Sequence, residues 1–303
     1  MATSTPSPDS ANSSNPPEDT LLAAVRSAVP DLQGATATTS LSGGITNRNY
    51  RVDTPRGAFV VRIGSPSAEQ LGIHRAHEHA SSLAAAHAGV GADVIAFLPS
   101  LRAIVTRFLD GRVLTADDIR HDPSTLRRVA LAVRTIHQGS PVPGAFSPFD
   151  AVRDYHTKSL ALSVPMPDAM PAALDRLRRI ELEIGGAFEP RPCHNDLLPA
   201  NLLDDGERVR IIDWEYAGMG DPFFDLGNLA VNSQLDEPGE RALLEIYAGH
   251  ASDEHLRRLR LMRLASDMRE SLWGFLQAGI SSLDFDFLGY GRTHLDRFLA
   301  LSS

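Results

Sequence analysis

The chain has 303 residues, of which 43% are apolar and 22% are charged. This balance is typical of a globular protein and excludes disorder over most of the chain, while the length exceeds what one compact core usually fills, so we expect two lobes. Asp and Glu (38) outnumber Lys and Arg (29), a formal charge of 29 − 38 = −9, which argues against a nucleic-acid polymer as partner because no basic stripe would neutralise its phosphates.

Three further features bear on the compartment. The single cysteine, Cys193, cannot form an internal disulfide or a cysteine cluster for zinc, which fits a reducing environment. No uninterrupted apolar run reaches the ~20 residues that a membrane span needs. Residues 1–19 contain no Lys, no Arg and no apolar block, so they predict a disordered tail and neither a secretory signal nor a mitochondrial presequence. We therefore expect a cytoplasmic protein without a membrane span.

After the tail, the pattern predicts a small sheet with helices beside it. Strand-like segments are short and bounded by turn residues, whereas helical segments carry apolar residues at helical spacing. In chain order these are a helix at residues 20–29, strands at 49–52 and 58–63 joined by a turn at 54–57, a helix at 69–88, and one or two strands at 101–109.

Beyond Gly111 the pattern becomes mostly helical. Helices are predicted at residues 124–137, at 172–184 and through most of 241–300, with a β-rich insert at 191–214. The expected fold is α+β with two lobes, divided into a disordered tail at 1–19, an N-terminal nucleotide-binding lobe at 20–106, a hinge at 107–111, and a helical C-terminal catalytic and acceptor-binding lobe at 112–303.

The most informative segment begins at Cys193 and reads C-H-N-D-L-L-P-A-N-L-L, then a turn and an apolar strand that ends at Asp213. It reduces to H-x-D-x-x-x-x-N with a strand-terminal Asp, the arrangement of a phosphoryl-transfer catalytic loop. A hydroxyl that attacks phosphorus must lose its proton, so we assign Asp196 as the base. The phosphates of ATP require Mg²⁺, which prefers oxygen ligands, and Asn201 and Asp213 can supply them. His194 is expected to be structural.

The segments at 193–203 and 211–228 resemble the aminoglycoside phosphotransferase and choline/ethanolamine kinase superfamily, and bacterial choline/ethanolamine kinase-like proteins most closely. The resemblance runs from about residue 41 to the end and implies a protein-kinase-like fold with a small β-rich N-terminal lobe. It also implies that Asp225 braces the catalytic loop from the next helix. The chain passes almost at once from Asp213 to this helix, which leaves no room for a peptide-binding segment and favours a small-molecule hydroxyl acceptor.

The nucleotide phosphates are expected beneath a glycine-containing loop of the N-terminal lobe. Gly43 and Gly44 allow backbone N–H groups to approach phosphate oxygens, and Thr46 and Asn47 can add donors. The loop is not a Walker A loop, because the Gly-Lys-Ser/Thr sequence is missing. Paired glycines alone would be an ordinary turn, but their position ahead of the strand at 58–63 favours the phosphate loop.

Arg62 lies near the end of that strand, where many kinases have a phosphate-pairing lysine and the choline-kinase-like branch often has arginine. Arginine stays charged and binds phosphate as a fork. The resemblance implies a helix carboxylate as its partner, and Glu78 matches the family's position better than Glu69, although a solvated helix glutamate is the alternative. The backbone near Arg107 and Leu109 is expected to read the purine edge.

The stretch at 265–287 also resembles choline/ethanolamine kinases, in which aromatic side chains and nearby acids hold the cationic head of the substrate. Trp273 and Tyr290 fall at matching positions, and Glu215 could add negative charge. For Trp273 the alternative is ordinary core packing. Glu270 stands where eukaryotic choline kinases have a second aromatic residue, and a carboxylate there favours ethanolamine or another amine.

Arg269, next to Glu270, leaves three possibilities open. It would repel a cationic acceptor if both faced the pocket. It could instead pair with Glu270 or Asp267. It could also bind a negatively charged acceptor, which would exclude choline.

We therefore predict an ATP- and Mg²⁺-dependent kinase that transfers the γ-phosphoryl group to a hydroxyl of choline, ethanolamine or a similar amino alcohol. The alternative enzyme is an aminoglycoside or other antibiotic or metabolite kinase, whose pocket would need several carboxylates. A non-catalytic nucleotide-binding protein is the alternative of another class, and loss of the base or of a metal ligand would be its mark, yet all three residues are present. The sequence makes no prediction of the oligomeric state. For the antibiotic-kinase alternative, the carboxylates available to bind a polycation are Asp284, Asp286, Glu215 and Glu270.

Overall fold

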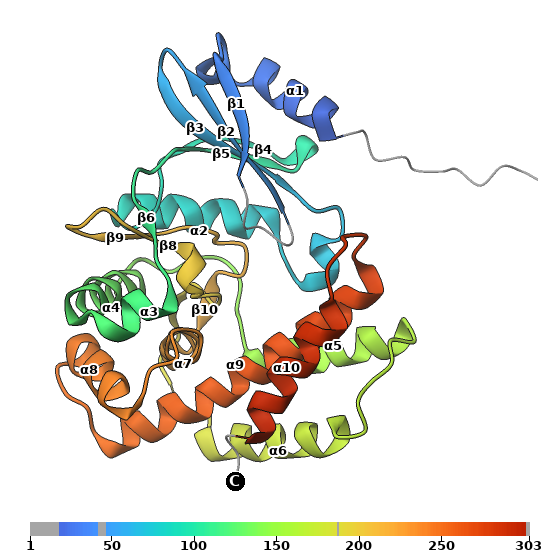
Figure 1. The fold of residues 1–303 in the computed structure, drawn as a ribbon, viewed down its shortest axis with the longest axis vertical. Helices are drawn as coiled ribbons and strands as arrows, with labels where there is room; N and C mark the ends of the chain where they lie inside the picture. The colour runs from blue at the N-terminus through green and yellow to red at the C-terminus, as the bar shows by residue number, and fades with distance from the viewer. Residues whose placement is uncertain (1–17, 42–46, 187, 301–303) are drawn as a thin grey trace, which may run out of the picture.

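The computed structural model describes residues 18–41, 47–186 and 188–300 (Figure 1). The predicted disordered tail falls outside these residues up to residue 17. Helix α1 (Glu18–Ala28) begins at Glu18 and not at residue 20.

The described N-terminal part is built around a five-stranded antiparallel sheet in the order β1-β2-β3-β5-β4. Apolar side chains of α1 pack on one face of this sheet, and Phe59, Val61 and Ile63 of β3 contribute to that core. Figure 1 shows α1 on the outer side of the sheet and α2 on the side toward the helical part. The strands are β1 (Ala37–Leu41), β2 (Asn47–Thr54), β3 (Gly57–Gly64), β4 (Val94–Leu98) and β5 (Ala103–Arg107).

Two expectations for this part need correction. The helix predicted at residues 69–88 is two elements, η2 (Ala68–Leu71) and α2 (Arg75–His87), because Gly72 adopts φ 76° and ends the first of them. Strand β4 was not predicted, since its apolar run is short and no alternation distinguishes it from a loop.

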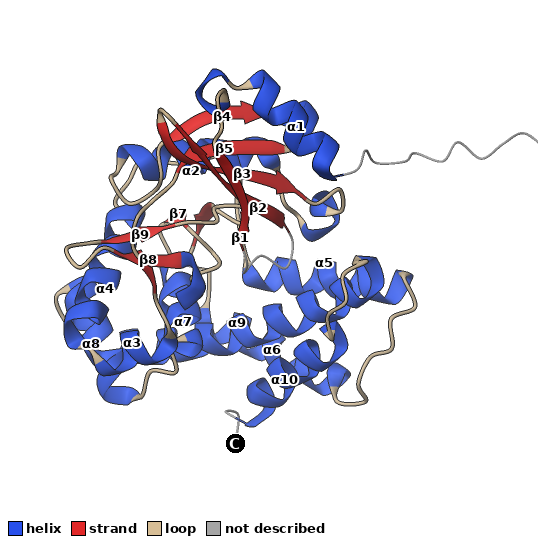
Figure 2. Ribbon diagram, turned by 45° about the horizontal axis from the view of Figure 1, so that its top comes forward, coloured by secondary structure: helices blue, strands red, loops and turns tan. Residues whose placement is uncertain are grey.

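The C-terminal part is mostly helical, with short strands where the site lies (Figure 2). Three of these strands form a sheet in the order β6-β8-β9, and β7 pairs with β10. The strands are β6 (Arg112–Val113), β7 (Arg191–Cys193), β8 (Leu202–Asp204), β9 (Val209–Ile211) and β10 (Gly218–Gly220). The β-rich insert predicted at 191–214 is therefore present.

The helices of this part surround α9, which packs against α5, α7 and α10. Every residue of α9 from Ala265 to Gln277 is buried, so the charged side chains within that stretch must find partners. The helices are α3 (Ala116–His121), α4 (Pro123–His137), α5 (Pro148–Ala161), α6 (Met170–Ile184), α7 (Pro222–Asn232), α8 (Glu237–Ala248), α9 (Asp253–Ile280) and α10 (Phe287–Ala300). The α5 helix was not predicted.

Within the described ranges, no helix combines the length and the hydrophobicity needed to cross a membrane.

Candidate active site

The predicted catalytic loop follows β7 and leads into the short helix η4 (Pro199–Asn201). Asp225 of α7 holds the start of this loop. Its two carboxylate oxygens accept hydrogen bonds from the backbone N–H groups of His194 (2.8 Å) and Asn195 (2.7 Å). Because Asp225 is completely buried, these bonds are shielded from water, and the loop is fixed to the helix that follows it.

His194 links the loop to the segment between β9 and Asp213. Burial lowers the pKa of His194, so its ring is neutral at neutral pH. Nε2 lies 2.9 Å from the carbonyl oxygen of Ile212, and Nδ1 lies 3.2 Å from the backbone nitrogen of Asp196. A carbonyl can only accept, so Nε2 carries the hydrogen and Nδ1 accepts from Asp196.

Asp196 is held from two sides. Its Oδ1 lies 3.0 Å from Nη1 of Arg269, and its carbonyl oxygen accepts a hydrogen bond from the Asn201 amide at 2.9 Å. Burial raises the pKa of Asp196 to about 7; the charge of Arg269 opposes this and that of Glu270 adds to it. The carboxyl group therefore changes its protonation state close to neutral pH, as suits a group that takes up a proton.

The backbone segments that carry Asn201 and Asp213 lie beside one another. The carbonyl oxygen of Asn201 accepts from the backbone N–H of Ile212, which brings it next to the segment of Asp213. The amide nitrogen of Asn201 donates to Asp196, and the amide oxygen is the atom of this side chain that could bind a cation. One carboxylate and one amide oxygen are hard donors, so this pair fits Mg²⁺.

Arg62 of β3 joins three carboxylates that come from different parts of the chain. Its Nη2 lies 2.5 Å from Asp213 Oδ1 and 3.0 Å from Glu215 Oε2, and its Nε lies 3.3 Å from Glu78 Oε1. The structure thus brings Arg62 to Glu78, as the resemblance implied. The rejected candidate Glu69 lies in η2, ahead of the helix that carries Glu78.

Arg75 is a member of this cluster that the sequence analysis missed. Its Nη1 lies 2.5 Å from Glu78 Oε2 and 3.4 Å from Glu215 Oε2, and its Nη2 donates to the Asn47 side chain at 3.0 Å. The available signal was the spacing of Arg75 and Glu78, which are three residues apart on one helix face.

Asn47 and Glu215 complete the cluster. Asn47, predicted as part of the phosphate loop, is the first residue of β2. Its amide donates to Glu215 Oε2 at 2.9 Å, so it is bonded to the segment after Asp213. Burial raises the pKa of Glu215. Glu215, expected in the acceptor site, makes these contacts with Arg62, Arg75 and Asn47. The other predicted loop residues, Gly43, Gly44 and Thr46, lie outside the described residues.

The predicted hinge begins at the end of β5. The backbone N–H of Arg107 donates to the Asp93 carbonyl at 2.8 Å, and that of Phe108 donates to the Ala58 carbonyl at 3.0 Å. These two donors are engaged within the sheet. Leu109 follows directly and therefore remains the candidate for a hinge N–H that reads a base edge.

The predicted acceptor residues come together on α9 and α10. Glu270 Oε1 lies 2.5 Å from Arg269 Nη1, and Glu270 Oε2 accepts from the Tyr290 hydroxyl at 2.7 Å. The Trp273 indole donates to the Tyr216 hydroxyl at 3.0 Å, and the rings of Trp273 and Tyr290 are 5.5 Å apart. Tyr216, which the sequence analysis did not select, therefore belongs to this group through Trp273.

The structure also decides between the partners left open for Arg269. Its Nη1 contacts Glu270 and Asp196, whereas Asp267 pairs with Arg297 on α10. Trp273 is buried and packed in the core, as the core-packing alternative expected, and its part in acceptor binding stays a prediction.

A second group of possible metal ligands lies behind the loop. Ligand atoms of His137, Cys193 and Asp225 lie within 4.8 Å of one another. Burial raises the pKa of the Cys193 thiol, which stays protonated. Both Asp225 oxygens already accept hydrogen bonds from the loop, and Oδ2 also lies 2.9 Å from Nε2 of His137. Hydrogen bonding therefore accounts for this cluster.

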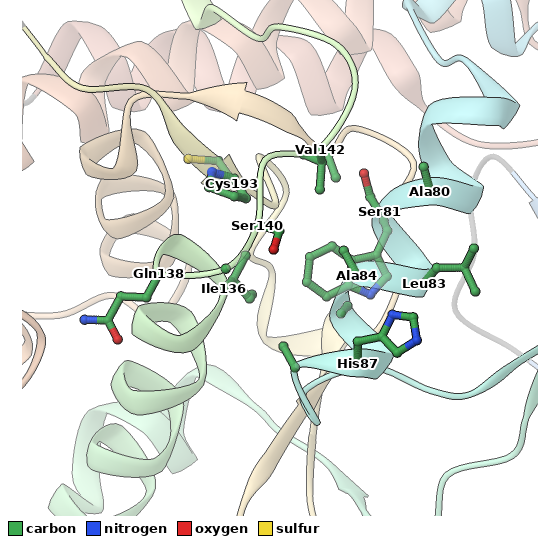
Figure 3. Close-up of a pocket in the computed structure, with 16 residues that line it drawn as sticks. Ala80, Ser81, Leu83, Ala84, His87, Ile136, Gln138, Ser140, Val142 and Cys193 are labelled. Atoms are coloured by element: carbon green, nitrogen blue, oxygen red, sulfur yellow. The ribbon is translucent and has the colours of Figure 1, made fainter.

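A cavity of about 510 Å³ lies between α2 and α4 (Figure 3). Cys193 and Trp214, which neighbour His194 and Asp213 in sequence, line part of it, as does Ser81 of α2. Apart from this adjacency it is separate from the site, since none of the described residues selected from the sequence lines it.

Comparison with known proteins agrees with this geometry. A model of the phosphotransferase enzyme family matches residues 37–262. Protein LicA of Haemophilus influenzae is 29% identical over 243 residues, which cover 76% of this chain and 70% of that protein. A solved structure of a choline/ethanolamine kinase family protein from Mesorhizobium loti is 29% identical with a TM-score of 0.80, and the match covers 93% of this chain and 95% of that one.

The choline kinase LicA from Streptococcus pneumoniae shares the fold at 20% identity, also with a TM-score of 0.80, over 93% of this chain and 98% of that one. The predicted α+β, protein-kinase-like fold is thereby confirmed.

Proposed function

This chain belongs to the phosphotransferase enzyme family, as the resemblance of its catalytic loop implied, and on that premise we propose that it transfers the γ-phosphoryl group of ATP, with Mg²⁺, to the hydroxyl of a small amino alcohol of the choline/ethanolamine class. The proposal rests on the convergence of Asp196, Asn201 and Asp213. The side-chain amide of Asn201 donates to Asp196, and the backbone carbonyl of Asn201 accepts from the backbone N–H of the residue before Asp213.

Each of these residues has a distinct task. Asp196 accepts the proton of the attacking hydroxyl. Arg269 and Asn201 hold it in place before the acceptor binds, so little reorganisation is needed at the moment of reaction. Asn201 and Asp213 would hold Mg²⁺, which when bound neutralises charge on the phosphates.

The nucleotide is assigned to the N-terminal part of the chain. Arg62 would bind its phosphates, with Glu78 holding the guanidinium in position. Asn47 would act from the end of the phosphate loop, and Leu109 from the hinge. The proposed division is a tail at 1–19, a nucleotide lobe at 20–106, a hinge at 107–111, and a catalytic and acceptor lobe at 112–303.

The amino-alcohol class is favoured over a polycationic antibiotic. Asp284 and Asp286 are exposed, and Asp286 accepts a hydrogen bond from the backbone N–H of Gly289 in the first turn of α10. They therefore do not join Glu270 in a buried acidic pocket. The Mesorhizobium loti relative is described as a choline/ethanolamine kinase family protein, which supports an amino alcohol as the acceptor. The buried single cysteine supports a reducing compartment, the cytoplasm.

An acceptor panel read by ADP release tests this proposal. The full chain with ATP and Mg²⁺ would be offered choline, ethanolamine, thiamine, amino sugars and aminoglycosides, and we expect an amino alcohol to give the highest kcat/KM. Asp196→Asn should lower turnover about a thousandfold and leave nucleotide binding intact. Turnover of this variant at the wild-type rate would reject Asp196 as the base, and nucleotide binding without transfer to any acceptor would favour the non-catalytic alternative.

A further inference from the structure

Resting on the proposed function, we infer that Arg269 is the specificity-determining residue of the acceptor site. Its guanidinium occupies the aromatic face on which a quaternary ammonium would bind. The site therefore takes amino alcohols whose ammonium carries N–H donors and rejects those whose nitrogen is fully alkylated.

The first step is the position of the guanidinium. Cζ of Arg269 lies 4.3 Å from the centre of the Tyr216 ring, within the range of a cation–π contact. Arg269 is only 1% exposed, so this contact is withdrawn from solvent. The Trp273 indole donates to the Tyr216 hydroxyl at 3.0 Å and fixes the ring. One aromatic face beside Asp196 is thus already filled by a cation of the protein itself.

The second step is that Arg269 is held there strongly. One nitrogen, Nη1, meets both Asp196 (3.0 Å) and Glu270 (2.5 Å). Its Nε and Nη2 have no hydrogen-bond acceptor among the described residues, so the ring of Tyr216 supplies a main contact for the rest of the group. An incoming cation without hydrogen-bond donors would have to displace a buried ion pair to reach that ring.

The third step concerns what remains attractive to an acceptor. Asp196 and Glu270 bring two carboxylates against one guanidinium, which leaves one negative charge when both are ionised. Burial alone would raise the pKa of Glu270, but Arg269 and its other partners outweigh this effect and the pKa is lowered, so the carboxylate is charged. Each carboxylate oxygen can accept more than one hydrogen bond.

A primary, secondary or tertiary ammonium can therefore donate an N–H to Glu270 without entering the aromatic face. A quaternary ammonium has no N–H and depends on that face. The presence of at least one N–H on the acceptor nitrogen is thus the chemical feature that the site selects.

A methylation series measures this directly. kcat/KM would be determined for ethanolamine, its N-methyl and N,N-dimethyl derivatives, and choline, which differ in the number of N–H groups. For the wild type we expect a drop of about tenfold or more at the last step alone, where the final N–H is lost. A choline value equal to or above that of the dimethyl compound would overturn the inference.

Variants assign the effect to Arg269. Arg269→Met should lower turnover generally, because Asp196 loses its partner, but it should also reduce the dimethyl-to-choline ratio of kcat/KM about tenfold. Arg269→Lys keeps a cation and should retain the ratio. Because Arg269→Met leaves Glu270 buried without its partner, the double variant Arg269→Met/Glu270→Gln, which removes both charges, provides the second test. An unchanged ratio in folded Arg269→Met and in the folded double variant would reject Arg269 as the determinant.

Calorimetric binding separates this inference from the proposed function. Tetramethylammonium has no hydroxyl and needs no turnover. We expect it to bind the double variant at least tenfold more tightly than the wild type, even if the true acceptor proves not to be an amino alcohol. Equal binding by both proteins, or binding by neither, would overturn the inference, whereas failure of the whole acceptor series with this binding difference intact would overturn only the amino-alcohol proposal.

Discussion

Arg62 and Asp213 are 151 positions apart, yet Nη2 of the arginine lies 2.5 Å from a carboxylate oxygen of the aspartate. One residue is carried by β3 of the five-stranded sheet and the other follows β9. The proposed phosphate-binding cation and the proposed magnesium ligand are therefore in direct contact. This contact joins the N-terminal sheet to the catalytic segment.

Replacing Arg62 should impair the use of ATP more than that of the acceptor. Arg62→Met removes a guanidinium that contacts Asp213, Glu78 and Glu215, and loss of charge-assisted contacts to the phosphates should lower kcat/KM for ATP about a hundredfold. Steady-state kinetics with ATP varied at saturating acceptor measures this. Arg153→Met, which removes an exposed ion-paired arginine, is the matched control and should leave kcat/KM for ATP unchanged. A wild-type value for the Arg62 variant would contradict its assigned role.

Asp225 should matter for stability as well as for activity. Asp225→Ala leaves the buried N–H groups of His194 and Asn195 without acceptors, so we expect the free energy of unfolding to fall by about 3–5 kcal/mol. Urea denaturation followed by circular dichroism provides the measurement. Asp154→Ala, at an exposed ion pair with Lys158, should change stability little. Equal midpoints for the two variants would show that the loop does not depend on this brace.

The pH dependence should report Asp196. A base acts in its deprotonated form, and burial raises its pKa to about 7, so kcat/KM for the acceptor should rise tenfold per pH unit below pH 7 and level off above it. The negative charge of Glu270 contributes to this elevation, so Glu270→Gln should move the rise to lower pH. Buffers spanning pH 5 to 9 would reveal both effects. A rise centred near the ordinary value for aspartate, or no shift in the variant, would count against this account.

The packing of α9 against α10 should not tolerate a methyl group at Gly274. A Cβ atom there would lie 2.8 Å from the backbone nitrogen of Gly291, so the two helices would have to separate. Gly274→Ala should cost about 1–3 kcal/mol of stability. It should also weaken acceptor binding, because Tyr290 lies next to Gly291. Thermal unfolding and KM for the acceptor are the readouts. Gly186→Ala, where a Cβ meets nothing within 4 Å, is the control, and equal losses in both variants would refute the close approach.

The sequence predicted the elements whose pattern is local. The loop from His194 to Asn201 carries its spacing within a few residues, and the hairpin at 54–57 and the helices at 124–137 and 172–184 follow from turn residues and helical periodicity. The helix predicted at 69–88 failed at Gly72, because the left-handed backbone there is a single-residue feature that periodicity does not detect.

Contacts between side chains of distant segments were beyond the reach of a local pattern. The spacing of Arg75 and Glu78 was a local signal, but the contact of Arg75 with Glu215 depends on a distant segment. Tyr216 was missed because its place beside Arg269 likewise depends on a distant helix.

By itself, the sequence determined the catalytic loop, the candidate base and magnesium ligands, and the family, because these depend on residue identity at short fixed spacing. Only the tertiary structure decided that Arg62 reaches Asp213 and that Arg269 lies between Asp196 and Glu270 over Tyr216. The physical reason is that a buried charge pairs with whichever opposite charge the packing of remote helices and strands brings within a few ångströms, and Asp196 and Arg269 are 73 positions apart.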